Sequence, residues 1–93
     1  MYKIPEENYP IIEDWVDRES RVLDLGCGDG SLLSSLVAKK GVDGFGVEIS
    51  HDMILQCVQK GICVYQADID RDLSEWADGS FDFQIGERVH KYD

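Results

Sequence analysis

The residues best suited to hold a ligand lie in one glycine-rich segment. Residues 26–30 read GCGDG and directly follow a short apolar run, residues 22–25, which read VLDL. Alternating glycines allow a tight turn in which a ligand can touch the backbone. A helix that begins after such a turn points free N–H groups at the same ligand. The segment therefore predicts a binding site that is lined by backbone and flanked by two carboxylates, Asp24 and Asp29.

The two carboxylates indicate which kind of ligand suits this turn. The dinucleotide-binding fingerprint is G-x-G-x-x-G, whereas the sequence here is G-x-G-x-G and Ser31 occupies the position of the last glycine. Asp24 and Asp29 would also repel a pyrophosphate, but they favour a cationic ligand that carries a sulfonium and an α-amino group. A nicotinamide dinucleotide is therefore disfavoured. A tight strand–helix turn without any ligand remains the structural alternative.

Two further carboxylates end two later apolar runs. Glu48 lies 20 residues after the central glycine of the turn, where a carboxylate can accept hydrogen bonds from ribose hydroxyls. Asp68 ends the next run and can accept from an adenine amino group, with Ile69 beside it for contact with the ring. Ligands bind at the carboxyl ends of the strands in such sheets. A solvated charge remains the alternative for both residues, and Asp70 and Asp72 crowd the loop of Asp68.

These residues must be positioned by an alternation of strands and helices. Apolar residues recur with helical spacing in three stretches, and short apolar runs lie between and after them. The helical stretches are residues 10–18, 31–40 and 50–60, the apolar runs are residues 22–25, 45–49, 62–67 and 81–85, and a short helix or turn is expected at 70–76. The pattern predicts an α/β fold, a doubly wound Rossmann-like parallel sheet with helices on both faces.

Composition argues against several classes of function. The 93 residues carry nine Lys and Arg against nineteen Asp and Glu, and the formal net charge of −10 disfavours nucleic acid and anionic membranes as partners. No apolar run is long enough to span a bilayer, and no signal peptide is recognisable. Cys27, Cys57 and Cys63 form no CxxC pair, and His51 and His90 lack metal-ligand spacing. Free thiols, no metal site and a cytoplasmic location are therefore expected.

The last eight residues break the alternation. Residues 86–93 contain one aliphatic residue and show no period, so we expect an irregular tail after a ligand-binding unit at residues 1–85. The fourth strand would then be an exposed sheet edge, which natural proteins usually cover. Self-association through that edge is the resulting prediction.

Taken together, the motifs resemble those of a known family. Residues 22–30 (VLDLGCGDG), 46–48 (GVE), 66–70 (QADID) and 79–82 (GSFD) look like the successive motifs of class I S-adenosylmethionine-dependent methyltransferases. More narrowly, residues 11–83 resemble the MetW-type methionine-biosynthesis proteins. The resemblance implies a truncated class I methyltransferase fold, the N-terminal half of a seven-stranded sheet, with about four strands in the order 3-2-1-4.

The resemblance also implies a cofactor and the residues that bind it. The cofactor would be S-adenosylmethionine, with S-adenosylhomocysteine as its product. The glycine-rich turn would hold the methionine part near Asp24, Glu48 would hold the ribose, and Asp68 would hold the adenine between two isoleucines. The implied cofactor-binding residues are Asp24, Gly26, Cys27, Gly28, Gly30, Glu48, Ile49, Asp68 and Ile69.

Two functions are implied by the same resemblance. The first is a methyltransferase by class, although the strands that usually build the acceptor site are absent and no catalytic residue is identified. The second is an accessory role, because MetW-type proteins are associated with homoserine O-acyltransferase in methionine biosynthesis. In that role the domain would bind the acyltransferase and sense S-adenosylmethionine.

Overall fold

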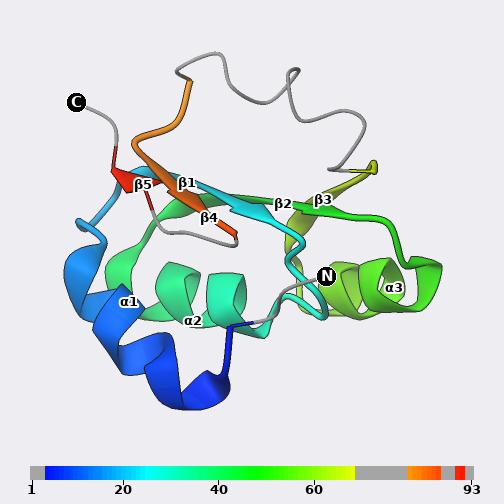
Figure 1. The fold of residues 1–93 in the computed structure, drawn as a ribbon, viewed down its shortest axis with the longest axis horizontal. Helices are drawn as coiled ribbons and strands as arrows, with labels where there is room; N and C mark the ends of the chain where they lie inside the picture. Colours follow the sequence, from blue (N-terminus) through cyan, green and yellow to red (C-terminus); the bar gives the residue numbers. More distant parts are fainter. Residues whose placement is uncertain (1–3, 69–79, 87–89, 92–93) are drawn as a thin grey trace.

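A twisted sheet of five strands organises the chain in the computed structural model, which describes residues 4–68, 80–86 and 90–91 (Figure 1). The strands follow the order β3-β2-β1-β4-β5. Their bounds are Arg21–Leu25 (β1), Asp43–Glu48 (β2), Cys63–Gln66 (β3), Phe83–Ile85 (β4) and His90–Lys91 (β5). The helices are Glu6–Asn8 (η1, a 3-10 helix), Tyr9–Trp15 (α1), Ser31–Lys40 (α2) and His51–Gln59 (α3). The first four strands are parallel, which confirms the predicted fold and its 3-2-1-4 order.

The register of the parallel strands brings their carboxyl ends to one edge of the sheet. Leu25 of β1 pairs with Val47 of β2, and Glu48 of β2 pairs with Gln66 of β3. The glycine-rich turn after β1 and the segments after β2 and β3 therefore emerge next to one another. This is the edge at which α/β sheets bind ligands.

All described helices cover one face of the sheet (Figure 1). The chain moves in one direction from β1 to β2 to β3, so right-handed crossovers place α2 and α3 on the same side, where α1 joins them. The prediction of helices on both faces is therefore not met by the described residues. β4 lies on the other side of β1 from β2 and β3, and the helix or turn expected at residues 70–76 lies outside the described residues.

Side chains of β1 alternate between the two faces, as expected for a strand. Val22 belongs to the larger core cluster, which packs beneath the helices together with Leu33 and Leu36 of α2. Leu23 and Leu25 point to the opposite face and form a smaller cluster with Val47. Asp24 shares the side of Val22, so its carboxylate faces the helices.

The helix ends follow local capping signals. α2 begins at Ser31 and ends at Lys40 as predicted, and Gly41 closes it with a left-handed φ of 62°. Ser50 caps α3, because its Oγ accepts a hydrogen bond from the N–H of Met53 at 3.5 Å. α1 ends at Trp15, earlier than predicted, where Val16 turns to an extended backbone with ψ of 131°.

The tail that was expected to be irregular contains the short strand β5. It pairs antiparallel with β4, with Phe83 opposite Lys91 and Gln84 opposite His90. The outer edge of β4 is therefore covered at these positions, and the prediction of an exposed edge is wrong there. The structure accordingly gives no support to self-association through β4.

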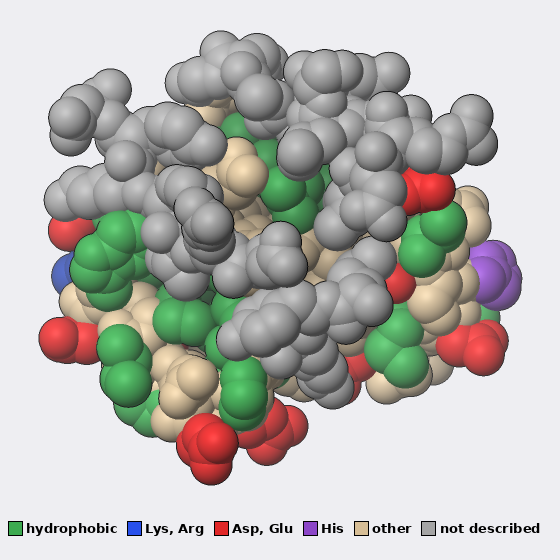
Figure 2. Space-filling view, viewed as in Figure 1, with side chains coloured by type: hydrophobic (Ala, Val, Ile, Leu, Met, Phe, Trp, Pro, Cys, Tyr) green, Lys and Arg blue, Asp and Glu red, His purple; other side chains and the backbone are tan. Residues whose placement is uncertain are grey.

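The surface reflects the acidic composition. Figure 2 shows acidic side chains around the rim of one face, on both sides and at the bottom below α1. Within the part of the chain that the structure describes, no helix is long and apolar enough to cross a membrane.

Candidate functional site

The backbone conformation of the glycine-rich turn explains why it contains glycines. Gly26, Gly28 and Gly30 have φ values of 74°, 60° and 82°, all in the left-handed region that glycine adopts without strain. A Cβ built on Gly30 would lie 3.1 Å from the Sγ of Cys57, which leaves little room for a side chain. A Cβ on Gly28 would meet no described atom within 4 Å. The backbone at Gly28 is therefore open to an approaching ligand.

Neighbouring elements hold this turn from two sides. The N–H groups of Gly26 and Cys27 both donate to the carbonyl oxygen of Val47 at the end of β2, at 2.7 and 3.1 Å. From α3, the Cys57 thiol lies 3.2 Å from the carbonyl oxygen of Gly28. The turn is thus fixed in shape before any ligand binds.

Glu48 links the glycine-rich turn to the start of α3. The residue is 5% exposed, and its carboxylate accepts three backbone hydrogen bonds. Oε1 accepts from Gly28 N–H at 2.9 Å, and Oε2 accepts from Ile49 and Ser50 N–H at 3.1 and 2.9 Å. The structure therefore brings Glu48 and the turn together, as their spacing predicted.

Asp24 is also buried, but its surroundings are different. Its side chain is 5% exposed at the carboxyl end of β1, and no described group donates a hydrogen bond to its carboxylate. Burial, and secondarily the charge of Glu48, raises the pKa of Asp24 to about 7. A carboxylate in this position gains from a cationic partner.

Asp29 differs from Asp24 because it already has partners. Its Oδ1 accepts hydrogen bonds from the N–H and Oγ of Ser31 at 3.0 and 2.7 Å. The ammonium of Lys60 lies 3.6 Å from Oδ2 and donates to the backbone oxygen of Asp29 at 2.8 Å. From the sequence, both aspartates are expected to repel a pyrophosphate. In the structure, Lys60 offsets the charge of Asp29. Asp24 is the one without an ionic partner among the described residues.

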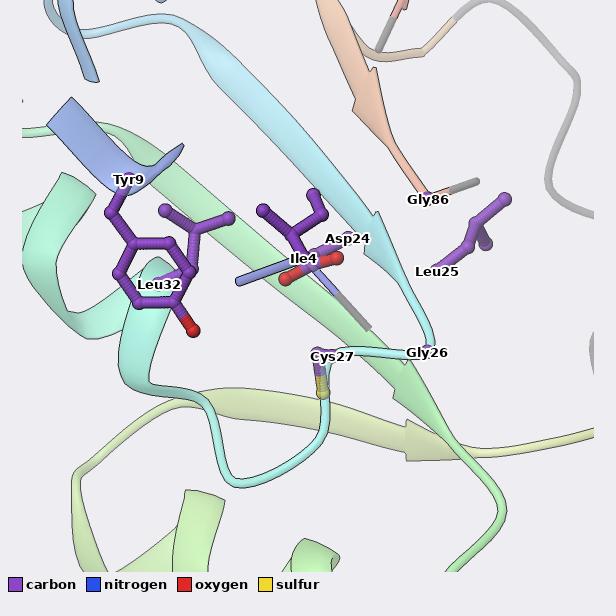
Figure 3. Close-up of a pocket in the computed structure, with 8 residues that line it drawn as sticks. All are labelled: Ile4, Tyr9, Asp24, Leu25, Gly26, Cys27, Leu32 and Gly86. Carbon is purple, nitrogen blue, oxygen red and sulfur yellow. The ribbon is translucent and has the colours of Figure 1, made fainter. Parts of the chain in front are cut away.

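A small pocket opens beside Asp24 (Figure 3). It has a free volume of about 20 Å³, room for about one water molecule. The lining residues are Ile4, Tyr9, Asp24, Leu25, Gly26, Cys27, Leu32 and Gly86. Sequence reasoning did not find Ile4 and Tyr9, because they carry no motif and reach the site only through the packing of the N-terminal segment.

The Cys27 thiol is buried and is not activated as a nucleophile. Its Sγ lies 3.7 Å from the Sγ of Cys57, and burial raises the pKa of the Cys27 thiol, which disfavours the nucleophilic thiolate. A Cβ built on Gly46 would lie 2.5 Å from the Sγ of Cys27, so the glycine leaves room for this thiol. No group of three or more His, Cys, Asp or Glu among the described residues is arranged to hold a metal ion.

The remaining predicted residues lie around the same edge. Ala67 N–H donates to the carbonyl oxygen of Glu48 at 3.2 Å, which brings the half-buried Asp68 to the end of β2. Ile49 is 49% exposed directly after Glu48. Ile69 lies outside the described residues.

The comparisons with known proteins agree with this geometry. A family model described as "Methionine biosynthesis protein MetW" matches residues 6–90. The chain belongs to this family. The predicted resemblance to MetW-type proteins is thereby confirmed, and the fold is that of class I methyltransferases.

Individual relatives of this MetW-family chain support the same assignment. The bifunctional methionine biosynthesis protein MetXA/MetW of Rhodopirellula baltica is 34% identical over 74 residues, which are 71% of this chain and 12% of that protein. A TehB-like SAM-dependent methyltransferase from Corynebacterium glutamicum shares the fold with a TM-score of 0.72 at 23% identity. That likeness covers 87% of this chain and 44% of the other.

A third relative was solved with a ligand. The RNA methyltransferase from Salinibacter ruber, in complex with S-adenosyl-L-homocysteine, has a TM-score of 0.64 and 25% identity over 80% of this chain and 56% of its own. The MetW-family chain thus spans less than two thirds of the length of each of these relatives.

Proposed function

We propose that this chain binds S-adenosylmethionine, and S-adenosylhomocysteine as its product, at the carboxyl edge of β1, β2 and β3. The observation that carries the proposal is the buried carboxylate of Asp24, which has no donor among the described residues and lies beside an open glycine turn. A ligand with an ammonium group satisfies that carboxylate. The Salinibacter ruber enzyme, solved with S-adenosyl-L-homocysteine, supports this choice of ligand.

Each predicted residue has a role in this proposal. The turn residues line the methionine part of the cofactor, with the ammonium group next to Asp24. Glu48 holds the ribose, Asp68 accepts from the adenine amino group, and Ile49 and Ile69 contact the faces of the ring. The turn residues are Gly26, Cys27, Gly28 and Gly30.

The geometry of Glu48 limits how it can hold a ribose. A carboxylate offers about four acceptor positions, and three are occupied by the backbone groups of Gly28, Ile49 and Ser50. One position on Oε1 is left for a hydroxyl while the turn keeps its shape. Glu48 therefore both shapes the site and contacts the ligand in this proposal.

The bound cofactor supplies a methyl group on a sulfonium, which reacts by in-line displacement. The chain's own residues bind and orient it, and positioning is the main requirement of that reaction. We assign residues 1–85 to the cofactor-binding unit and residues 86–93 to a terminal segment, of which Gly86 also lines the pocket beside Asp24. The whole protein would then be a methyltransferase of the MetW type that acts in methionine biosynthesis.

An accessory role is the second candidate. The Rhodopirellula baltica relative joins MetXA and MetW in one protein, which favours a physical association between two such activities. For this chain the partner would be homoserine O-acyltransferase, and bound S-adenosylmethionine would be the signal. Co-purification of the two proteins, strengthened by S-adenosylmethionine, is the expected result.

Calorimetric titration tests cofactor binding directly. We expect saturable binding of S-adenosylmethionine and S-adenosylhomocysteine by the wild-type chain and a loss of at least about tenfold in Glu48→Ala, because the variant loses both the ribose acceptor and the support of the turn. Asp14→Ala, which removes an exposed carboxylate on α1, is the matched control and keeps wild-type affinity. A folded wild-type chain that binds neither compound would refute the proposal.

A further inference from the structure

The pocket beside Asp24 is lined in part by residues that precede β1 in the chain. Figure 3 shows the Asp24 carboxylate with Tyr9 and Leu32 on one side and Leu25 and Gly86 on the other. Ile4 also lines the pocket and comes from the extended segment before η1. Apart from Asp24, the described lining side chains offer only a phenol and a thiol as polar groups. Among these described residues, the carboxylate is therefore the one charged group.

The chemistry of the pocket selects a cation with hydrogen-bond donors. An ionised carboxylate that is 5% exposed is costly when it has no partner. A primary ammonium provides three donors and a compensating charge in one compact group. No lysine, arginine or histidine is among the described residues that line the pocket, so a ligand can supply the cation there.

The size of the pocket further limits which cationic group of a ligand can bind there. Its free volume of about 20 Å³ holds about one group of the size of water, which an unsubstituted ammonium matches. A nitrogen that carries an additional carbon needs more room than this beside Tyr9 and Ile4, and overpacking of this kind weakens binding. The rest of the ligand has to lie outside the pocket, along the open backbone of Gly28.

We propose that Ile4 and Tyr9 are specificity-determining residues, whose side chains restrict the Asp24 pocket to a ligand with an unsubstituted primary ammonium group. This inference rests on the proposed function and adds a selection rule to it. Ile4, which precedes η1, and Tyr9 of α1 are part of the binding site in this view, although neither side chain carries a charge.

The test compares three ligands by calorimetry on the full chain. They are S-adenosylhomocysteine, its N-methyl derivative, which keeps the charge and gains one carbon, and 5′-methylthioadenosine, which lacks the amino-acid end. We expect N-methylation to weaken wild-type binding at least about tenfold. In Tyr9→Ala this penalty should fall to about threefold or less, while binding of 5′-methylthioadenosine stays unchanged, because only the pocket is enlarged.

Two further variants test whether the effect of Tyr9→Ala comes from the enlarged pocket. Ile4→Ala enlarges the same pocket from a segment outside any helix and should also reduce the penalty, even if Tyr9→Ala destabilises α1. Ile11→Ala is the matched control, because Ile11 lies on the same helix as Tyr9 and is 70% exposed; its penalty should equal that of the wild type.

The outcomes separate this inference from the proposed function. If the wild type binds both S-adenosylhomocysteine forms equally, or if neither enlarged variant reduces the penalty, the inference is wrong while cofactor binding stands. If the folded wild type binds neither S-adenosylhomocysteine nor 5′-methylthioadenosine, the proposed function fails, and this inference falls with it.

Discussion

Asp24 and Glu48 show how two buried carboxylates at one sheet edge can differ in chemistry. Glu48 accepts hydrogen bonds from three backbone N–H groups, which occupy most of the acceptor positions of its carboxylate. Asp24 has no described donor, so burial favours its protonated form and raises its pKa to about 7. Glu48 thus links the glycine-rich turn to the start of α3 even without a ligand. The carboxylate of Asp24 is stabilised only when a cation binds or a proton is taken up.

The raised pKa of Asp24 leads to a prediction for stability. In the unfolded chain the group titrates near 3.8, and in the folded chain near 7, so between these values the folded state binds more protons. The free energy of unfolding therefore falls as pH rises through this window, and each pKa unit is worth about 1.4 kcal/mol. Asp24→Asn lacks this penalty and should be more stable than the wild type at pH 8, by an amount that shrinks toward pH 4.

Urea unfolding of both proteins from pH 4 to pH 8 measures this difference. Asp14→Asn serves as the control, because its carboxylate is exposed and its stability should follow the wild type. Parallel curves for Asp24→Asn and wild type would show that Asp24 is not held neutral by the fold. The same variant should lose affinity for S-adenosylhomocysteine but not for 5′-methylthioadenosine, which has no ammonium group.

At the scale of elements, one carboxylate joins α1 to α2. Glu13 is 8% exposed on α1 and accepts hydrogen bonds from Ser35 Oγ and Lys39 Nζ of α2, both at 2.8 Å. The hydrogen bond from Lys39 is the main cause that lowers the pKa of Glu13 below its ordinary value of 4.5, and Ser35 adds to it against the effect of burial. Since α1 also carries Tyr9, this pair helps to hold the wall of the pocket.

Glu13→Gln should therefore destabilise the chain in a pH-dependent way. Because the folded-state pKa is lowered, the contribution of Glu13 is fully present above pH 4.5 and is lost as pH falls through the folded-state pKa. Thermal unfolding should show a lower midpoint for the variant at pH 7 and a smaller difference from wild type at pH 3. A difference that stays constant with pH would mean that the ion pair contributes no net stability.

At the scale of the whole molecule, local signals were readable from the sequence and long-range contacts were not. The bounds of α2 were predicted because Ser31 and Gly41 mark its ends within the segment itself. The spacing of Gly28 and Glu48 was informative because parallel pairing of β1 and β2 aligns their ends. The approach of Tyr9 to Asp24 depends on how α1 packs, and no pattern within either segment encodes that.

The sequence did not predict the ion pair of Asp29 or the pairing of β4 with β5, because both are long-range contacts. Asp29 meets Lys60 across 31 residues, and acidic residues in a turn give no sign of a distant partner. The strand β5 is two residues long, too short to show an alternation, and its pairing with β4 is visible only in three dimensions. Helices on a single face follow from the order of β1, β2 and β3, which the alternation of elements alone does not specify.

The position of the site within the sheet gives a prediction for the whole molecule. A ligand at the carboxyl edge should slow hydrogen exchange of the amides of Gly28, Ile49 and Ser50, which are bonded to Glu48 there. The amides of Glu19 and Asp43 are also hydrogen-bonded, at 2.8 and 2.9 Å, but lie at the opposite edge and serve as internal controls. Saturating S-adenosylhomocysteine should protect the first group more strongly, because binding suppresses local opening in addition to global unfolding. Equal protection at both edges would instead indicate that the ligand acts only through global stability, and stronger protection at Glu19 and Asp43 would place the ligand at the wrong end of the sheet for the proposed site.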